Sequence, residues 1–129
     1  MQGLHLIADL HQCTCPVHLL LDAAALEIFC IDACQRHQLT VIGQLFHAFR
    51  DAEEAAAGVT GTVVLAESHL AIHTWPEIAA VTLDIYVCNY SDDNSARARA
   101  LFAEVIQQFS PSRQEIHELQ RGQLALNRE

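Results

Sequence analysis

Residues 61–87, GTVVLAESHLAIHTWPEIAAVTLDIYV, contain three apolar stretches rich in aromatic and β-branched residues, separated by very short connections. The strands predicted from them are residues 61–67, 70–75 and 79–87. Pro76 interrupts the run before the third strand, at a position that suits a strand end or an edge. Because parallel neighbours need a long crossover, connections this short favour antiparallel pairing.

The flanking sequence extends this sheet and adds two helices. The remaining predicted elements are strands at 3–9, 39–48 and 113–120 and helices at 18–37 and 95–109. Residues 50–58, RDAEEAAAG, are expected to form a loop or a short helical excursion, and 124–129, LALNRE, a loose tail. The order β-α-β-β-β-β-α-β predicts an α+β two-layer sandwich, an antiparallel sheet with two helices on one face. The other face would need cover, and a second subunit is one way to supply it.

The composition predicts a single globular domain over residues 1–129, because 51% of the residues are hydrophobic and only 18% are charged. Sixteen acidic and seven basic side chains give a formal net charge of −9, which argues against nucleic-acid binding. No apolar run is long enough for a membrane span, and the first residues lack the basic flank of a secretory signal. We therefore expect a cytoplasmic protein that does not bind membranes.

The five cysteines predict neither a disulfide framework nor a metal site. Their number is odd, and Cys13-x-Cys15 has no second closely spaced ligand pair with which to complete a tetrahedral zinc site. Cys30 and Cys34 lie one helical turn apart in an apolar segment, where free cysteine packs as a small hydrophobe.

Residues 66–77, AESHLAIHTWPE, gather two histidines, a serine, two glutamates and a tryptophan in an otherwise apolar region. Ser68 has no flanking glycine within two residues, so the nucleophile elbow of serine hydrolases does not fit. His69 and His73 are four residues apart, but the HExxH zinc motif requires a helix and a glutamate after the first histidine. Taken singly, these residues could also be turn or sheet residues without a chemical role.

At fixed spacing, however, this segment resembles the prokaryotic S-adenosylmethionine decarboxylases, the short pyruvoyl-dependent form of that family. The resemblance rests on segments that span nearly the whole chain. They are Leu4-His5-Leu6, Phe46-His47-Ala48-Phe49, Gly58-Val59-Thr60-Gly61, Glu67-Ser68-His69-Leu70, Ile72-His73-Thr74-Trp75-Pro76-Glu77, Asp84-Ile85-Tyr86-Val87-Cys88 and Arg121-Gly122. His73 follows Ser68 by five residues and Cys88 follows it by twenty.

The resemblance implies a proenzyme that cleaves itself between Glu67 and Ser68. The Ser68 hydroxyl would attack the Glu67 carbonyl, and elimination followed by loss of ammonia would leave a pyruvoyl group at residue 68. A β chain, 1–67, and an α chain, 68–129, would result. The pyruvoyl cofactor would form a Schiff base with S-adenosylmethionine and accept the electrons released with carbon dioxide, as pyridoxal phosphate does in other enzymes. The decarboxylated product would feed spermidine synthesis.

The resemblance also implies roles for further residues. His73 would promote the elimination, with Thr60 in place of a processing serine, and Cys88 would return a proton to the substrate carbon. Three residues would bind the substrate, namely Phe49 by stacking on adenine, Trp75 as a pocket wall and Glu77 through the ribose hydroxyls. The working unit would be a homodimer of cleaved protomers, with each site near the subunit contact.

Some features depart from the family pattern and leave alternatives open. Ile78-Ala79-Ala80 stands where many relatives have an aromatic residue and a glycine, and Asn89-Tyr90 replaces a glycine that often follows the cysteine. The 50–57 stretch is longer than expected and brings acidic residues close to the presumed pocket. The resemblance also allows ornithine or arginine as the alternative substrate, because some members of the family decarboxylate these amino acids. The acidic stretch could then hold the distal cation, or it could be a solvated surface loop. A non-catalytic regulatory homologue is a third hypothesis, although Ser68, His73 and Cys88 are all present.

Overall fold

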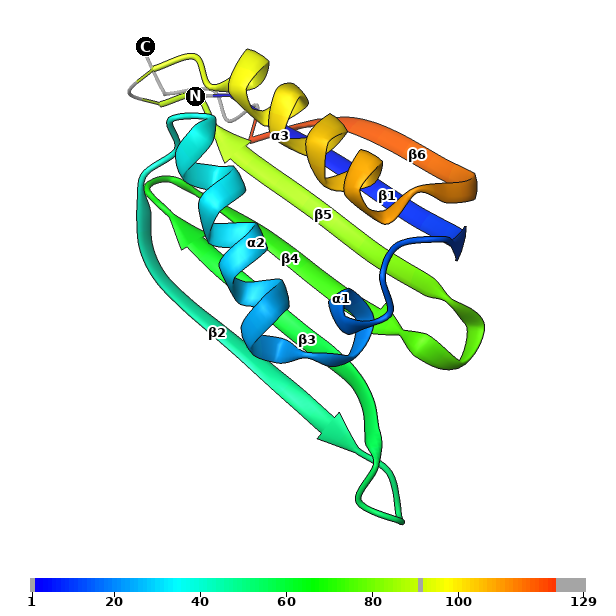
Figure 1. Cartoon of the computed structure of the whole chain (residues 1–129). Coiled ribbons are helices and arrows are strands. Elements are labelled where there is room, and N and C mark those ends of the chain that lie inside the picture. The colour runs from blue at the N-terminus through cyan, green and yellow to red at the C-terminus, as the bar shows by residue number, and fades with distance from the viewer. Residues whose placement is uncertain (1, 91, 123–129) are drawn as a thin grey trace, which may run out of the picture.

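The computed structural model describes residues 2–90 and 92–122, which form a six-stranded sheet with helices on one face (Figure 1). The elements are β1 Gly3–Cys13, α1 His18–Leu21, α2 Ala23–Arg36, β2 Val41–Arg50, β3 Ala56–Leu65, β4 Ser68–Trp75, a 3-10 helix Pro76–Ile78, β5 Ala80–Cys88, α3 Ser95–Phe109 and β6 Pro111–Arg121. The strand order is β2-β3-β4-β5-β1-β6, and every neighbouring pair is antiparallel. The predicted α+β two-layer sandwich is confirmed.

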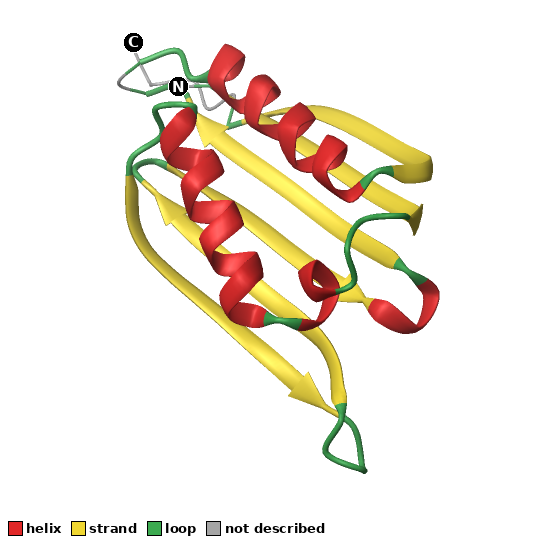
Figure 2. Ribbon diagram, in the orientation of Figure 1, coloured by secondary structure: helices red, strands yellow, loops and turns green. Residues whose placement is uncertain are grey.

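The hydrophobic core lies between the sheet and the helices, which all cover the same face (Figure 2). Alternate residues of each central strand point into it, as Leu70 and Ile72 of β4 do, because successive side chains of a strand face opposite sides. Cys30 and Cys34 of α2 are fully buried there, and burial raises the pKa of the Cys34 thiol to about 12. The prediction that these two cysteines pack as small hydrophobes is confirmed.

The predicted long helix 18–37 is wrong in one respect, because the chain breaks it at Asp22. This residue has extended backbone angles, and its carboxylate accepts hydrogen bonds from the Ala24 and Ala25 N–H groups, at 3.0 and 3.3 Å. Asp22 therefore caps the N-terminus of α2, and its side chain satisfies N–H groups that have no partner within the helix. The separate α1 is tied to the sheet by buried Thr74, whose hydroxyl donates to the Leu20 carbonyl at 2.7 Å.

Other elements differ from their predicted bounds by a few residues. Ala56–Gly58, predicted as loop, already belongs to β3, and residues 51–55 form a turn rather than a helix. The tail 124–129 lies outside the described residues. Within the described part of the chain, no helix is both long and apolar enough to cross a membrane.

The sheet face turned away from the helices, which we call the open face, is not covered by any described segment (Figure 2). It carries several large apolar side chains, including Leu45, 75% exposed, and Trp75, 45% exposed. An exposed sheet face with such side chains is typical of an interaction surface.

Candidate active site

The predicted cleavage site lies in the turn that joins β3 to β4. Leu65 pairs with Ser68, so only Ala66 and Glu67 form the turn. Glu67 has a φ of 68°, in the left-handed region where a residue with a side chain is strained by about 1–2 kcal/mol. The Ser68 hydroxyl makes a long hydrogen bond of 3.4 Å to the Ala66 carbonyl. The peptide bond between Glu67 and Ser68 is thus in a tight, strained turn.

Cys88 lies beside this turn, at the last position of β5. Its backbone N–H donates to the Glu67 carbonyl oxygen at 3.2 Å. The Asn94 side-chain amide in turn donates to the Cys88 carbonyl at 3.3 Å, and Cys88 itself is only 9% exposed. The structure therefore brings together three of the predicted residues, Glu67, Ser68 and Cys88.

The other predicted residues form a second group toward the far end of β4. Thr60 Oγ1 lies 3.1 Å from His73 Nδ1, across the β3–β4 pair. Both residues line a cavity of about 310 Å³, and its remaining walls are Phe49, Ala57, Gly58, Thr74, Trp75 and Glu77. Glu77 reaches it from the short 3-10 helix that follows β4. The residues predicted to bind substrate therefore share one cavity with the predicted processing histidine.

Within one chain, these two groups do not meet. Ser68 and His73 are five residues apart on one strand, which places their Cα atoms about 17 Å apart. An odd separation also turns the two side chains to opposite faces of the sheet. His73 cannot contact Ser68 of its own chain while β4 stays regular.

Comparison with known proteins identifies the family. The sequence profile described as S-adenosylmethionine decarboxylase matches residues 4–122, nearly the whole chain. The chain belongs to the S-adenosylmethionine decarboxylase family.

Individual relatives agree with this assignment. A protein named S-adenosylmethionine decarboxylase proenzyme from Picrophilus torridus is 37% identical over 120 residues, which cover 93% of this chain and 84% of that one. The protein of the same name from Archaeoglobus fulgidus is 30% identical and aligns with 93% of this chain and 97% of its own. The protein of the same name from Thermodesulfovibrio yellowstonii is 36% identical over 86 residues, which cover 67% of this chain and 58% of that one.

A solved structure matches the fold over the same extent. The crystal structure of the adenosylmethionine decarboxylase from Aquifex aeolicus superposes with a TM-score of 0.82 and 28% sequence identity. The match covers 98% of this chain and 96% of that chain. The six-stranded sheet and its helices are therefore an arrangement that a solved member of the S-adenosylmethionine decarboxylase family also has.

A larger cavity, of about 640 Å³, lies next to the one that holds His73. The two share Ala57 and Glu77, and the larger one is also lined by Asp51 of the acidic 50–57 stretch. Asp51 accepts hydrogen bonds from the backbone N–H groups of Glu53 and Ala55, at 2.8 and 3.0 Å, so its carboxylate also caps its own turn. None of the residues predicted for processing lines this larger cavity, whereas His73 and Thr60 line the smaller one.

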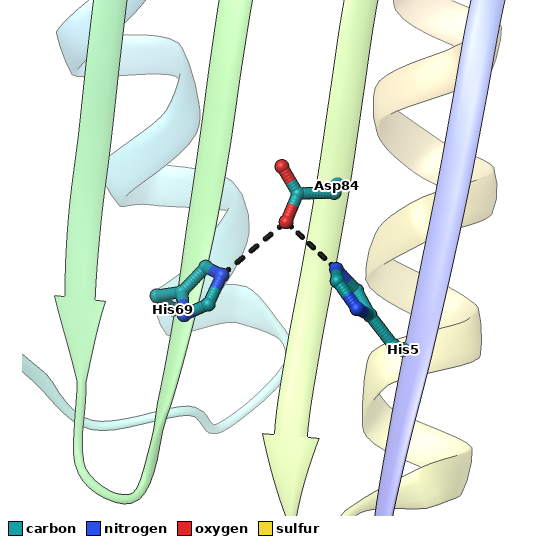
Figure 3. A group of neighbouring side chains, drawn as sticks. All are labelled: His5, His69 and Asp84. Atoms are coloured by element: carbon teal, nitrogen blue, oxygen red, sulfur yellow. Dashed lines mark hydrogen bonds and ion pairs between the residues drawn. The ribbon is translucent and has the colours of Figure 1, made fainter. Parts of the chain in front are cut away.

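Sequence reasoning did not find a group of three polar side chains on the open face, His5, His69 and Asp84 (Figure 3). They come from the adjacent strands β4, β5 and β1, and we call them the histidine–aspartate cluster. Asp84 Oδ2 lies 2.8 Å from His5 Nε2 and 3.2 Å from His69 Nε2. In the sequence His5 and Asp84 are polar residues between apolar ones, whereas His69 follows Ser68. Such alternation predicts which face a side chain takes but not the register that joins the three.

The ligand atoms of this cluster lie within 4.8 Å of one another, which would also suit a metal ion. A neighbouring contact argues against that interpretation. Arg121 Nη1 lies 2.9 Å from His5 Nδ1, and a guanidinium can only donate, so Nδ1 accepts and Nε2 carries the proton. The His5 Nε2–H group therefore donates to Asp84 and is not available to a metal.

Proposed function

We propose that this chain is a proenzyme that cleaves itself between Glu67 and Ser68 and then decarboxylates S-adenosylmethionine. The observation that carries the proposal is the hydrogen bond from the Cys88 N–H to the carbonyl oxygen of Glu67. That carbonyl belongs to the bond to be cut, lies in a strained turn and is followed at once by the Ser68 hydroxyl.

The first step uses only these residues. Ser68 Oγ attacks the Glu67 carbonyl carbon, the carbon–nitrogen bond breaks and an ester replaces the amide. Negative charge develops on the carbonyl oxygen during the attack, and the Cys88 N–H already points at that oxygen. A donor preoriented in this way stabilises the developing oxyanion without further reorganisation. Release of the left-handed Glu67 conformation also favours the reaction.

The second step needs a base. Removal of the Ser68 Cα proton breaks the Cβ–Oγ bond, which leaves Glu67 as a free carboxylate and residue 68 as dehydroalanine. Tautomerisation and hydrolysis by water then release ammonia and leave the pyruvoyl carbonyl. His73 is the candidate base, held by its contact with Thr60. Because His73 cannot reach Ser68 within one chain, we assign this role to His73 of a second copy.

A dimer formed through the open face accounts for that requirement. The Cys88 side chain and the His73 side chain both belong to this face, toward opposite ends of the strands. Glu67 and His73 are six residues apart, or about 20 Å along β4. A twofold axis that crosses the strands midway between them would set the cleavage turn of one copy against His73 and Thr60 of the other. The same contact would cover exposed Leu45 and Trp75.

The residues present fit the pyruvoyl group, since it is made from Ser68 itself and Cys88 lies beside it. The group supplies a carbonyl that binds the substrate amine and accepts the electron pair released with carbon dioxide. Cys88 donates a proton to the substrate carbon. Phe49 and Trp75 provide aromatic walls for adenine, and Glu77 accepts hydrogen bonds from the ribose hydroxyls. The product would serve spermidine synthesis, and a cytoplasmic location remains a prediction.

Intact-mass measurement under denaturing conditions tests self-cleavage. We expect two fragments, residues 1–67 and 68–129, with the second lighter by one ammonia than a peptide that begins with serine. Ser68→Ala should give one uncut mass. A wild-type chain that stays uncut on long incubation would overturn the proposal and favour a non-catalytic homologue.

Release of carbon dioxide tests the substrate. We expect turnover of S-adenosylmethionine and none of ornithine or arginine, because the cavity that holds His73 has two aromatic walls suited to a nucleoside. Turnover of either basic amino acid without turnover of the sulfonium compound would reverse this choice.

A further inference from the structure

Cleavage between Glu67 and Ser68 turns an internal position of the chain into a free end, because β4 then begins at residue 68 with no covalent link to β3. We propose that the histidine–aspartate cluster, His5, His69 and Asp84, holds this new end in place and so positions residue 68 beside Cys88. This inference rests on the proposed self-cleavage. His69 and Asp84 act through residue 68 and are positioning residues.

The contacts place the cluster at the point where the new end needs support. His69 is the first residue after the cap, and its Nε2 lies 3.2 Å from Asp84 Oδ2 on the neighbouring strand β5. The next residue, Leu70, is fully buried on the helix face, so the chain is already fixed there. His69 is thus the first residue after the cap whose side chain lies on the open face, and its hydrogen bond to Asp84 adds to the backbone pairing of the strand there.

The Asp84 carboxylate is itself fixed by a second hydrogen bond, so its position as acceptor for His69 is well defined. The same oxygen, Oδ2, accepts from His5 Nε2 at 2.8 Å, and the side chains of His5 and Asp84 are 14% and 30% exposed. Arg121 fixes the His5 tautomer from the other side, as its guanidinium donates to Nδ1. The Tyr86 ring packs against both histidines, with ring centroids 5.7 and 5.8 Å away. Partial burial limits competition from water for these hydrogen bonds.

The cluster also joins the two products of cleavage. His5 belongs to residues 1–67, whereas His69, Asp84 and Arg121 belong to residues 68–129. Before cleavage, the turn at Ala66 and Glu67 ties Ser68 to Leu65, which is buried, so β4 cannot separate from β3 at this end. After cleavage, residue 68 is still paired with Leu65 and Val87 in the sheet, but the end of a strand opens more readily than its middle. The cluster should therefore matter only in the cut protein.

Amide hydrogen exchange in a two-by-two design tests this dependence. The wild-type chain after full cleavage and the uncut Ser68→Ala precursor are each compared with and without Asp84→Ala. In the cut protein, we expect the amides of residues 69–72 to exchange about tenfold faster when Asp84 is replaced, as for loss of one charge-assisted hydrogen bond. In the uncut precursor, the same substitution should leave their exchange unchanged.

Two further variants exclude a general loss of folding. Asp84→Asn keeps an acceptor oxygen and should restore most of the protection, and Asp9→Ala removes a carboxylate from the same face without touching the cluster. If Asp84→Ala does not fold, His69→Ala replaces it in all four measurements.

In the cut enzyme kcat should fall with Asp84→Ala, while the rate of self-cleavage stays that of the wild type.

The outcomes separate the two proposals. Equal exchange with and without Asp84 in the cut protein, or an equal increase in cut and uncut proteins, would overturn the positioning role and leave the proposed function intact. A wild-type chain that never cleaves would overturn both.

Discussion

Two residues with left-handed backbones, Glu67 just before β4 and Ala79 just before β5, differ in the effect of their backbone strain. Glu67, with a φ of 68°, precedes the bond that we propose is cut, so release of its strain assists the reaction. Ala79, with a φ of 51°, ends the 3-10 helix after Trp75 and takes no part in any proposed step. Strain at Ala79 is therefore a cost to stability alone.

Replacement of Ala79 by glycine should stabilise the fold. Glycine adopts the left-handed region without the penalty of about 1–2 kcal/mol that alanine incurs, although it also makes the unfolded chain more flexible. We expect a net gain of about 0.5–1 kcal/mol. Urea unfolding of Ala79→Gly in the uncut Ser68→Ala background measures it. A loss of stability would show that Ala79 is not strained.

Cys88 is proposed to act twice, through its backbone N–H in cleavage and through its thiol in decarboxylation. Cys88→Ala retains the N–H and removes the thiol, so the chain should still cleave while turnover falls by about 10²–10⁴-fold. Intact mass and carbon dioxide release measure the two steps, with Cys15→Ala as a control. Loss of cleavage, or full turnover by the variant, would contradict this division.

At the level of elements, side-chain contacts fix the two long helices to each other and to the sheet. The end of α2 meets α3, where Arg36 and His37 both contact Glu104, the latter at 2.7 Å. Further along, α3 is joined to β6 by the ion pair between Arg99 and Glu118. Hydrogen bonding by Arg36, then by His37, holds the pKa of Glu104 below its ordinary value despite partial burial.

This shift predicts a pH-dependent contribution to stability. Because the pKa is lower in the folded than in the unfolded state, the Glu104 contacts stabilise the fold above the ordinary carboxyl pKa of about 4.3. Their contribution is lost as the pH falls through the lowered value. Glu104→Gln should thus cost less than about 1 kcal/mol at pH 7 and almost nothing toward about pH 3. Urea unfolding at both pH values measures this, and an equal cost at both would refute the electrostatic origin.

The helices also show which structural features the local sequence pattern can predict. The apolar spacing of residues 18–37 correctly predicts helix on both sides of Asp22, and the segment 95–109 matches α3 in full. The break itself depends on one capping side chain and on the anchoring of α1 by Thr74, a residue 54 positions away from its partner Leu20. The cap could have been found from Asp22 before a run of alanines, whereas the anchor could not.

In the whole molecule, the side chains of Cys88 and His73 lie toward opposite ends of one exposed sheet face. The cleavage turn with Cys88 belongs to one end, and the cavity with His73 and Thr60 lies toward the other. A second copy related by a twofold axis would unite them, and each dimer would then contain two composite sites.

Subunit mixing tests this arrangement. Chains with Ser68→Ala and chains with His73→Ala should each remain uncut alone. Unfolded together and refolded, they form mixed dimers in which one site combines an intact Ser68 with an intact His73. At equal concentrations, up to half of the His73→Ala chains should then cleave, as intact mass would reveal. No fragment from the mixture, although mixed dimers form, would show that each site is built within one chain.

The amino-acid sequence predicts the antiparallel sheet with helices on one face, the family, and the secondary elements apart from the break at Asp22. These depend on backbone preferences, on the period of apolar residues and on motif spacing along the chain, all of which can be read locally. Which of the candidate residues meet is known only from the folded chain. Ser68 and His73 are close in sequence yet lie far apart on a regular strand, while strand register brings His5 to His69 and Asp84. Register results from pairing between distant segments and the burial of a whole face, which no short stretch of sequence specifies.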